Sequence, residues 1–141
     1  MNRDRLRIYL SDHLAASAAL AARTKRSIRF NQGSGLEAVL RELLDETQKS
    51  IDAIEHAMGA LELRGGRSKE LAALAAERLG RLKLNGYFVN YSPLSRLEEL
   101  EMLAAGAGLR RRLWETLKIL GDEDKRLEEL DLDGLQRRAG A

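Results

Sequence analysis

Only a few side chains in this sequence combine the chemistry and the spacing of a binding site. His13 lies on the apolar face of a predicted helix, and Ser17 follows it by about one turn. If this helix forms a hairpin with the next, Thr47 lies near the same level, and Glu101 can reach that level from a later helix. These four residues are our candidate ligand-binding residues. A buried histidine that is hydrogen-bonded and fixes helix register is the more common arrangement and explains the same residues.

The histidines do not have the spacing of a ferritin-type two-metal site. Such a site takes a Glu-x-x-His pair from each of two helices. The residue three positions before His13 is Leu10, and the one before His56 is Ala53. The sequence also has no cysteine, which excludes thiolate ligands and thiol nucleophiles. We therefore expect no cofactor, leave open whether the candidate site binds a metal, and predict that His56 is solvated.

The composition is typical of one all-helical domain. The chain has 141 residues, which is enough to form a core, and 44% of them are hydrophobic. Leu and Ala dominate this share, and there is a single proline. These residues favour helices over strands. We predict an all-α fold in which residues 1–141 form a single domain.

Glycine-containing breaks divide the chain into five predicted helices. Within each, apolar residues recur at steps of three and four, over residues 5–30, 36–63, 68–85, 93–120 and 124–138. Gly121 is expected to end the fourth helix in the left-handed conformation, and Gly134 to fray the fifth. Short connections predict two antiparallel hairpins, joined by a crossover that contains the third helix. This order is that of a ferritin-like four-helix bundle, and a five-helix up-and-down bundle is the alternative.

Small residues in the fourth predicted helix indicate a close contact. Ala104, Gly106 and Gly108 interrupt it, although each glycine costs about 1 kcal/mol of helix propensity relative to alanine. The close approach of another helix would offset this cost. The alanine-rich helix at 5–30 is the expected partner, and a second copy of the chain, which would make a homo-oligomer, is the alternative.

The charges argue against a nucleic-acid partner. There are 24 basic and 22 acidic residues, so the net charge is only +2. Basic residues, such as Arg110, Arg111 and Arg112, gather late in the predicted helices, and acidic residues gather early, as the helix dipole favours. We interpret these groups as a solvated surface, because no recognised nucleic-acid motif accompanies them.

The sequence shows neither a signal peptide nor a membrane span. Residues 1–10 carry several charges and no apolar core, and no apolar run approaches the roughly 18 residues of a span. We expect a cytoplasmic protein without a membrane partner.

Several blocks of the sequence resemble an uncharacterised family of small bacterial helical proteins. These blocks are SDHLAAS at 11–17, GRLKLNG at 80–86, YSPLSRLEELEML at 91–103 and LW at 113–114. The resemblance covers most of the chain, but the second and the last predicted helices match loosely. It implies a ferritin-like bundle and carries over no activity.

We therefore predict a non-catalytic helical-bundle protein with a structural or protein-interaction role. The alternative is a ferritin-like bundle with an atypical metal or small-ligand site near its centre. A helical enzyme of the chorismate-mutase type, which binds a dianion with buried Arg and Lys, is less favoured. Its basic residues would have to lie on the apolar stripes, and here they fall mostly outside them.

Overall fold

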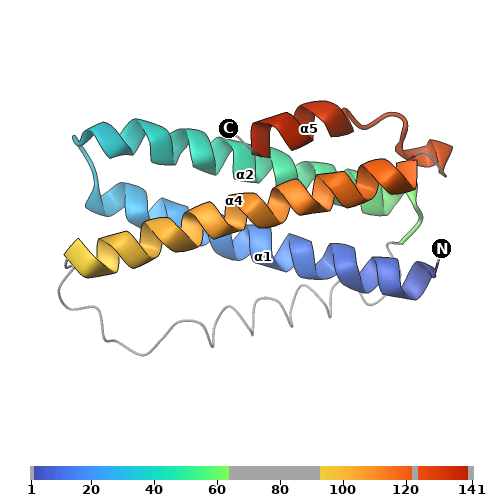
Figure 1. Cartoon of the computed structure of the whole chain (residues 1–141), viewed down its shortest axis with the longest axis horizontal. Coiled ribbons are helices and arrows are strands. Elements are labelled where there is room, and N and C mark those ends of the chain that lie inside the picture. The colour runs from blue at the N-terminus through green and yellow to red at the C-terminus, as the bar shows by residue number, and fades with distance from the viewer. Residues whose placement is uncertain (1, 64–92, 122–123, 140–141) are drawn as a thin grey trace.

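The computed structural model describes residues 2–63, 93–121 and 124–139 (Figure 1). Their elements are α1 (Arg3–Phe30), α2 (Gly35–Ala60), α4 (Pro93–Gly121), the 3-10 helix η1 (Lys125–Leu127) and α5 (Leu132–Ala139). Helix accounts for 88% of these described residues and strand for none, which confirms the prediction of an all-α fold. The helix predicted at 68–85 lies outside the described residues.

Side-chain hydrogen bonds mark the beginning of α1 and the turn into α2. Asn2 caps α1, because its side-chain oxygen accepts a hydrogen bond from the Arg5 amide at 3.1 Å. In the turn, the Ser34 hydroxyl donates to the Asn31 carbonyl at 2.7 Å. Gly33 has a φ of 74°, which only glycine adopts without strain, and its amide donates to the Glu37 carboxylate at 2.7 Å. These bonds close a tight turn, after which α2 runs back along α1 (Figure 1).

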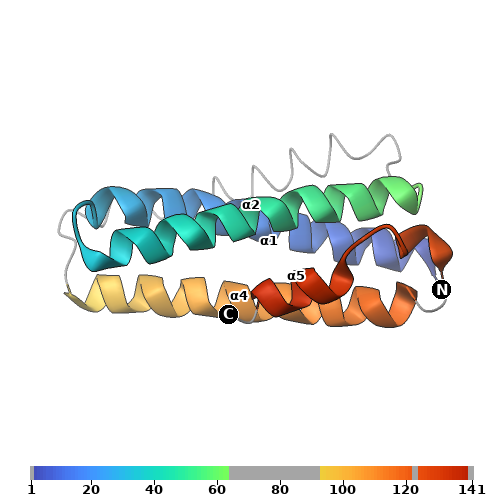
Figure 2. The same ribbon diagram turned by 90° about the horizontal axis from the view of Figure 1, so that it is seen from above.

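α1 packs against both α2 and α4 and is antiparallel to each of them (Figure 1). α4 packs on α1 and runs opposite to it, so that α4 and α2 point the same way (Figures 1 and 2). α5 runs back along α4 and contacts both α4 and α2. The ferritin-like order and the up-and-down alternative share these directions. They differ in the third predicted helix, which the described part of the chain does not include.

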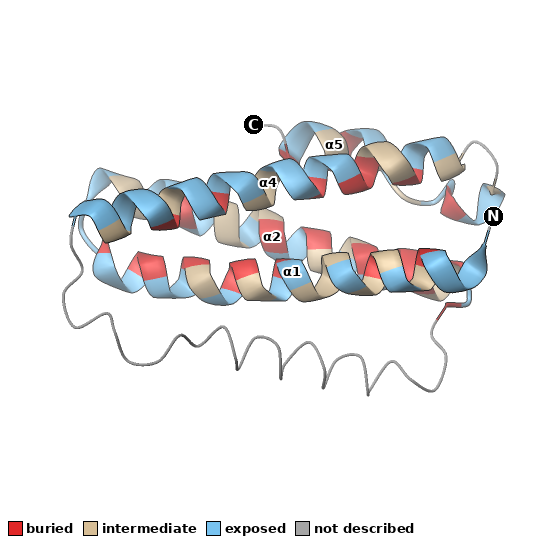
Figure 3. Cartoon of the chain, turned by 60° about the horizontal axis from the view of Figure 1, so that its bottom comes forward, coloured by how far each residue is buried: buried red, intermediate tan, exposed pale blue. Residues whose placement is uncertain are grey.

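The short α5 covers only part of the length of α2 and α4 (Figure 2). The buried residues face inward along the helices and form two clusters (Figure 3). One cluster includes Leu127, Leu135 and Ala139 from η1 and α5. The buried members of the other come from α1, α2 and α4 alone and are Leu20, Ile28, Leu40 and Leu103. Within the described residues, no fourth helix therefore covers α2 and α4 beyond the C-terminal end of α5. We call the surface of α2 and α4 in this region the open face.

The single C-terminal helix predicted at 124–138 is wrong. The structure has the one-turn helix η1, a turn and then α5. Asp124 and Asp131 explain the break, because their side chains accept hydrogen bonds from the amides of Arg126 (3.2 Å) and Gly134 (2.8 Å). An aspartate whose side chain accepts hydrogen bonds from amides two or three residues later begins a new helical turn and does not continue the preceding helix. Gly134 therefore lies in the first turn of α5, not at a frayed end.

Gly121 also differs from its prediction. It is the last residue of α4, and Gly33 is the only glycine with a positive φ among the described residues. Gly121 therefore does not adopt the left-handed conformation.

Candidate functional site

Three buried polar residues lie at one level near the middle of the bundle. At one end of the α1–α2 pair, Arg3 donates to the Leu61 carbonyl at 3.0 Å, and the turn at residues 31–34 closes the other end. Because the two helices rise equally per residue, Ser17 lies level with Thr47. On α4, Gly106 faces Leu20 of α1, which lies one turn after Ser17. Because α4 is antiparallel to α1, Arg110, one turn after Gly106, lies level with Ser17. These three residues are at most 3% exposed, and we call them the polar layer.

The hydroxyl groups of α2 at this level bond to their own helix. Thr47 Oγ1 donates to the Leu43 carbonyl at 2.7 Å, and Ser50 Oγ donates to the Glu46 carbonyl at 2.9 Å. Buried hydroxyls satisfied in this way impose little cost on the core. Their oxygens still have lone pairs that can accept a further hydrogen bond.

Arg110 is the exceptional member of the polar layer. Its Nε and Nη1 atoms are buried and have no hydrogen-bond partner. Burial lowers the pKa of its guanidinium, and the nearby negative charge of Glu46 partly offsets this effect. Among the described residues, however, no ion pair within 4.0 Å joins Arg110 to a carboxylate. An unpaired buried donor costs about 1–3 kcal/mol, and more when it is charged.

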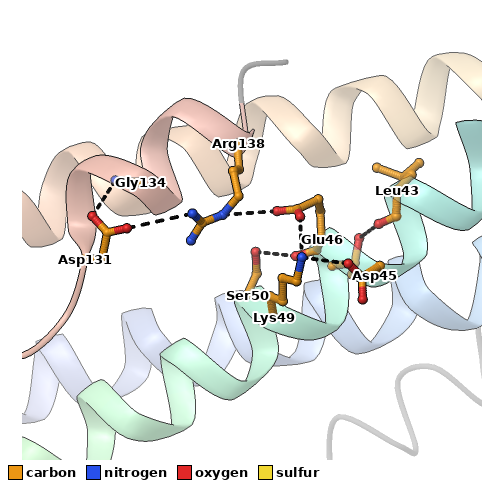
Figure 4. Close-up of polar contacts among 9 residues, drawn as sticks. Leu43, Asp45, Glu46, Lys49, Ser50, Asp131, Gly134 and Arg138 are labelled. Atoms are coloured by element: carbon orange, nitrogen blue, oxygen red, sulfur yellow. Dashed lines mark hydrogen bonds and ion pairs between the residues drawn. The ribbon is translucent and has the colours of Figure 1, made fainter.

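Glu46 connects the polar layer to the end of α5 (Figure 4). Its Oε1 atom lies 2.9 Å from Lys49 Nζ, and its Oε2 atom lies 3.4 Å from Arg138 Nε. Arg138 also lies 3.8 Å from the Asp131 carboxylate. One partly buried carboxylate is therefore shared by Lys49 and Arg138, and it is the nearby negative charge for Arg110 as well.

The structure does not place His13 or Glu101 in the polar layer. His13 is half-buried rather than largely buried, and its ring packs edge-on to Tyr9 with the ring centroids 4.6 Å apart. Burial lowers the pKa of His13, and the charge of Asp12 raises it by less. The described residues provide no hydrogen bond to His13, so the partners expected on α2 and α4 are not found. Glu101 is exposed, because it lies on the outer side of α4, away from the buried Leu103.

The described residues offer little for a metal ion. They contain no group of three or more His, Cys, Asp or Glu side chains that could hold one. His56 is 54% exposed, as predicted, and lies 4.0 Å from the Glu129 carboxylate. Over the same residues, no helix has the length and apolar character needed to cross a membrane.

The three small residues of α4 have different surroundings. Gly106 faces α1, and the atoms nearest to it belong to the Leu20 side chain rather than to the backbone. Gly108 is exposed and has open space where a Cβ atom would be, and Ala104 is exposed. The close contact thus involves Gly106 and the helix expected as its partner.

Sequence reasoning missed Arg110 because it assigned the wrong stripe to α4. The apolar repeat of the helix predicted at 93–120 begins with Leu97, Leu100 and Ala104, but Leu97 is 53% exposed and Ala104 is exposed as well. The buried stripe contains Leu103, Arg110, Trp114 and Leu117, at helical steps of seven, four and three. This spacing was available in the sequence. It places one arginine of the 110–112 run inside, which corrects the interpretation of the run as wholly solvated.

The flanks of α2 and α4 that contact α5 continue onto the open face. On α2, Glu46 contacts α5, and the same flank carries Val39, Glu42 and Leu43 in the preceding turns. On α4, Lys118 pairs with Asp133 of α5, and the same flank continues through Arg111, Ala107, Ala104, Leu100 and Arg96. The open face therefore has one acidic and one basic wall with apolar residues between them.

Comparison with protein families, curated proteins and solved structures finds no match to this chain.

Proposed function

We propose that this chain is a non-catalytic protein-interaction module, built as a ferritin-like helical bundle, that pairs with a second copy of itself along the open face. The observation that carries the proposal is the short reach of α5, because no other helix of the described residues covers the flanks of α2 and α4 beyond its end. A four-helix arrangement buries its apolar flanks only where all four helices are present. A helix from another copy would complete the missing corner.

The apolar residues of the open face support an interface. Val39 is 58% exposed on the α2 wall, although it shares a flank with residues that contact α5. Leu43 and Leu100 pack at the edge of the second core cluster and are only partly buried. Large apolar side chains grouped in this way are typical of interaction surfaces.

The charges of the open face favour a second copy over an unrelated partner. Glu42 lies on the α2 wall, one turn before Glu46, whereas Arg96 and Arg111 lie on the α4 wall. A two-fold axis parallel to the helices places the α2 wall of one copy against the α4 wall of the other, so each acidic wall meets a basic one. Such complementarity selects the partner and fixes the register.

The experiment is a charge exchange monitored by light scattering after size exclusion. The unchanged chain should be a dimer that dissociates on dilution. Glu42→Arg alone or Arg96→Glu alone should shift it to monomer, and the double variant should restore the dimer.

A matched control tests the apolar contact. Val39→Lys should weaken the dimer, but Ile119→Lys should not, because Ile119 is exposed on another face of α4. A chain that is monomeric at every concentration, or a dimer unaffected by all of these changes, would rule out the proposal.

A further inference from the structure

Arg110 has hydrogen-bonding capacity that the described residues do not use. A guanidinium has only donors, and Nε and Nη1 of Arg110 lack acceptors although the residue is 3% exposed. Along the same stripe of α4, its neighbours are the apolar side chains of Leu103 and Trp114. The missing acceptor must therefore come from outside the stripe.

Among the described residues, Glu46 is the carboxylate whose charge acts on Arg110, and it is already engaged. Both oxygens of Glu46 have cationic partners, Lys49 on one side and Arg138 on the other. The further carboxylates that pair with those cations, Asp45 and Asp131, are 64% and 66% exposed. Lys49 and Arg138 are themselves 50% and 42% exposed, and their charges are matched by these carboxylates. Among the described residues, Arg110 is thus the buried cation of this group that has no carboxylate of its own.

The end of α5 lies beside this group of charges. Arg138 occupies the last turn of α5 and reaches across to Glu46 (Figure 4). Its side chain is 42% exposed, so the Arg138 end of the Lys49–Glu46–Arg138 group reaches solvent. Beyond it begins the open face.

We propose that Arg110 is the anchor of a binding site for a small oxyanion, a carboxylate or phosphoryl group of a small molecule. The oxyanion accepts hydrogen bonds from Arg110 Nε and Nη1, and Arg138 supplies a second positive charge. Hydrogen bonds between a guanidinium and an oxyanion are charge-assisted and strong. The site goes beyond the proposed self-association and does not depend on it.

The test measures thermal unfolding of the full chain in inorganic phosphate, in acetate and in chloride at equal ionic strength. At least one oxyanion should raise the unfolding temperature of the unchanged chain above its value in chloride, and the rise should saturate. Phosphate alone would identify a phosphoryl ligand, and acetate alone a carboxylate. Equal unfolding temperatures in all three salts would overturn the proposal.

The run of three arginines provides a matched control. Arg110→Met should lose the saturable rise, whereas Arg111→Met should retain it, because Arg111 is exposed and pairs with Glu115 at 3.1 Å. Phosphate also stabilises proteins by exclusion from their surface, but that effect is common to both variants. An equal, saturable rise in the two variants would contradict the assignment of the site to Arg110.

A measurement on the unchanged chain keeps the test valid even if Arg110→Met does not fold. The Nε–H group of Arg110 should give a protected NMR signal, because it is buried. Titration with phosphate or acetate should shift this signal along a saturable curve, whereas the signal of Arg112, which is exposed, should remain in place. An Arg110 signal that does not move in either titration would overturn the proposal.

Discussion

Gly106 on α4 faces Leu20 on α1 so closely that a Cβ atom at position 106 would lie 2.7 Å from Leu20 Cδ1 and 2.8 Å from Cδ2. Leu20 is buried between the helices, so it has little freedom to move away. The glycine therefore sets how closely α1 and α4 pack at this level.

The first prediction compares alanine at the two glycines of α4. Gly108→Ala should stabilise the protein by about 0.5–1 kcal/mol, because alanine favours helix and nothing lies within 4 Å of the added atom. Gly106→Ala should be less stable than Gly108→Ala by at least about 1 kcal/mol, since Leu20 must shift. Urea unfolding of the two variants measures the difference. Equal gains would show that the contact is not tight.

The second prediction concerns the pH dependence contributed by His13. Burial lowers the pKa of His13 in the folded state, so below its ordinary value of 6.5 the unfolded chain binds more protons. The contribution of His13 to stability is complete above that value and is lost as the pH falls toward the lowered pKa. His13→Phe, which keeps a ring beside Tyr9, should therefore lose less stability than the unchanged chain between about pH 7.5 and 5.

Urea unfolding at several pH values provides the measurement. A His13→Phe variant with an unchanged pH profile would contradict the lowered pKa.

The third prediction concerns the aspartate that begins η1. Hydrogen bonds from the Arg126 side chain, at 2.9 and 2.6 Å, lower the pKa of Asp124 to about 2. An NMR titration should find this midpoint, and Arg126→Gln should raise it toward the ordinary value of 3.8. The stabilisation from this pair is present above 3.8 and is lost as the pH falls through about 2. The stability difference between the two chains should therefore be constant above about pH 5.

The fourth prediction compares two leucines on α4. Leu113 is fully buried, whereas Leu109, one turn earlier, is 54% exposed. Leu113→Ala should reduce the free energy of unfolding by about 2–5 kcal/mol. Leu109→Ala should change it by no more than about 0.5 kcal/mol. Trp114, the only tryptophan and fully buried, reports both transitions by fluorescence. A loss at Leu109 as large as that at Leu113 would place Leu109 in an interface.

The apolar repeats predicted the helices well where they are regular. In α1 the residues that recur at steps of three and four are Leu6, Leu10, His13, Ser17, Leu20 and Thr24, and all of them except His13 are buried. The register that places Ser17 level with Thr47 agrees with the contacts at both ends of the hairpin. Repeats fail where polar side chains bind the backbone. The predicted last helix is interrupted at Asp131, whose side chain accepts a hydrogen bond from the Gly134 amide. The apolar pattern around Asp131 does not indicate that bond.

The polar layer was only partly predictable. Ser17 and Thr47 were found because they interrupt an apolar stripe. Arg110 was not found, since an arginine within a basic run suggests solvent exposure. Its inward orientation follows only from its helical spacing of four and seven residues from the buried Trp114 and Leu117. Glu101 was misplaced for the same reason, because the assumed phase of α4 was wrong.

The unequal cover provided by α5 divides α2 into two parts with different local stability. Amides that follow Glu46 lie in a part of the helix packed on α1, η1 and α5, whereas those before it pack without η1 or α5. Hydrogen exchange follows the least costly opening that exposes an amide. The first turns of α2 should therefore exchange through a local opening of the α1–α2 turn, and the later turns only when the α5 side of the molecule separates. A single continuous helix thus belongs to two cooperative units, and their boundary coincides with the buried arginine.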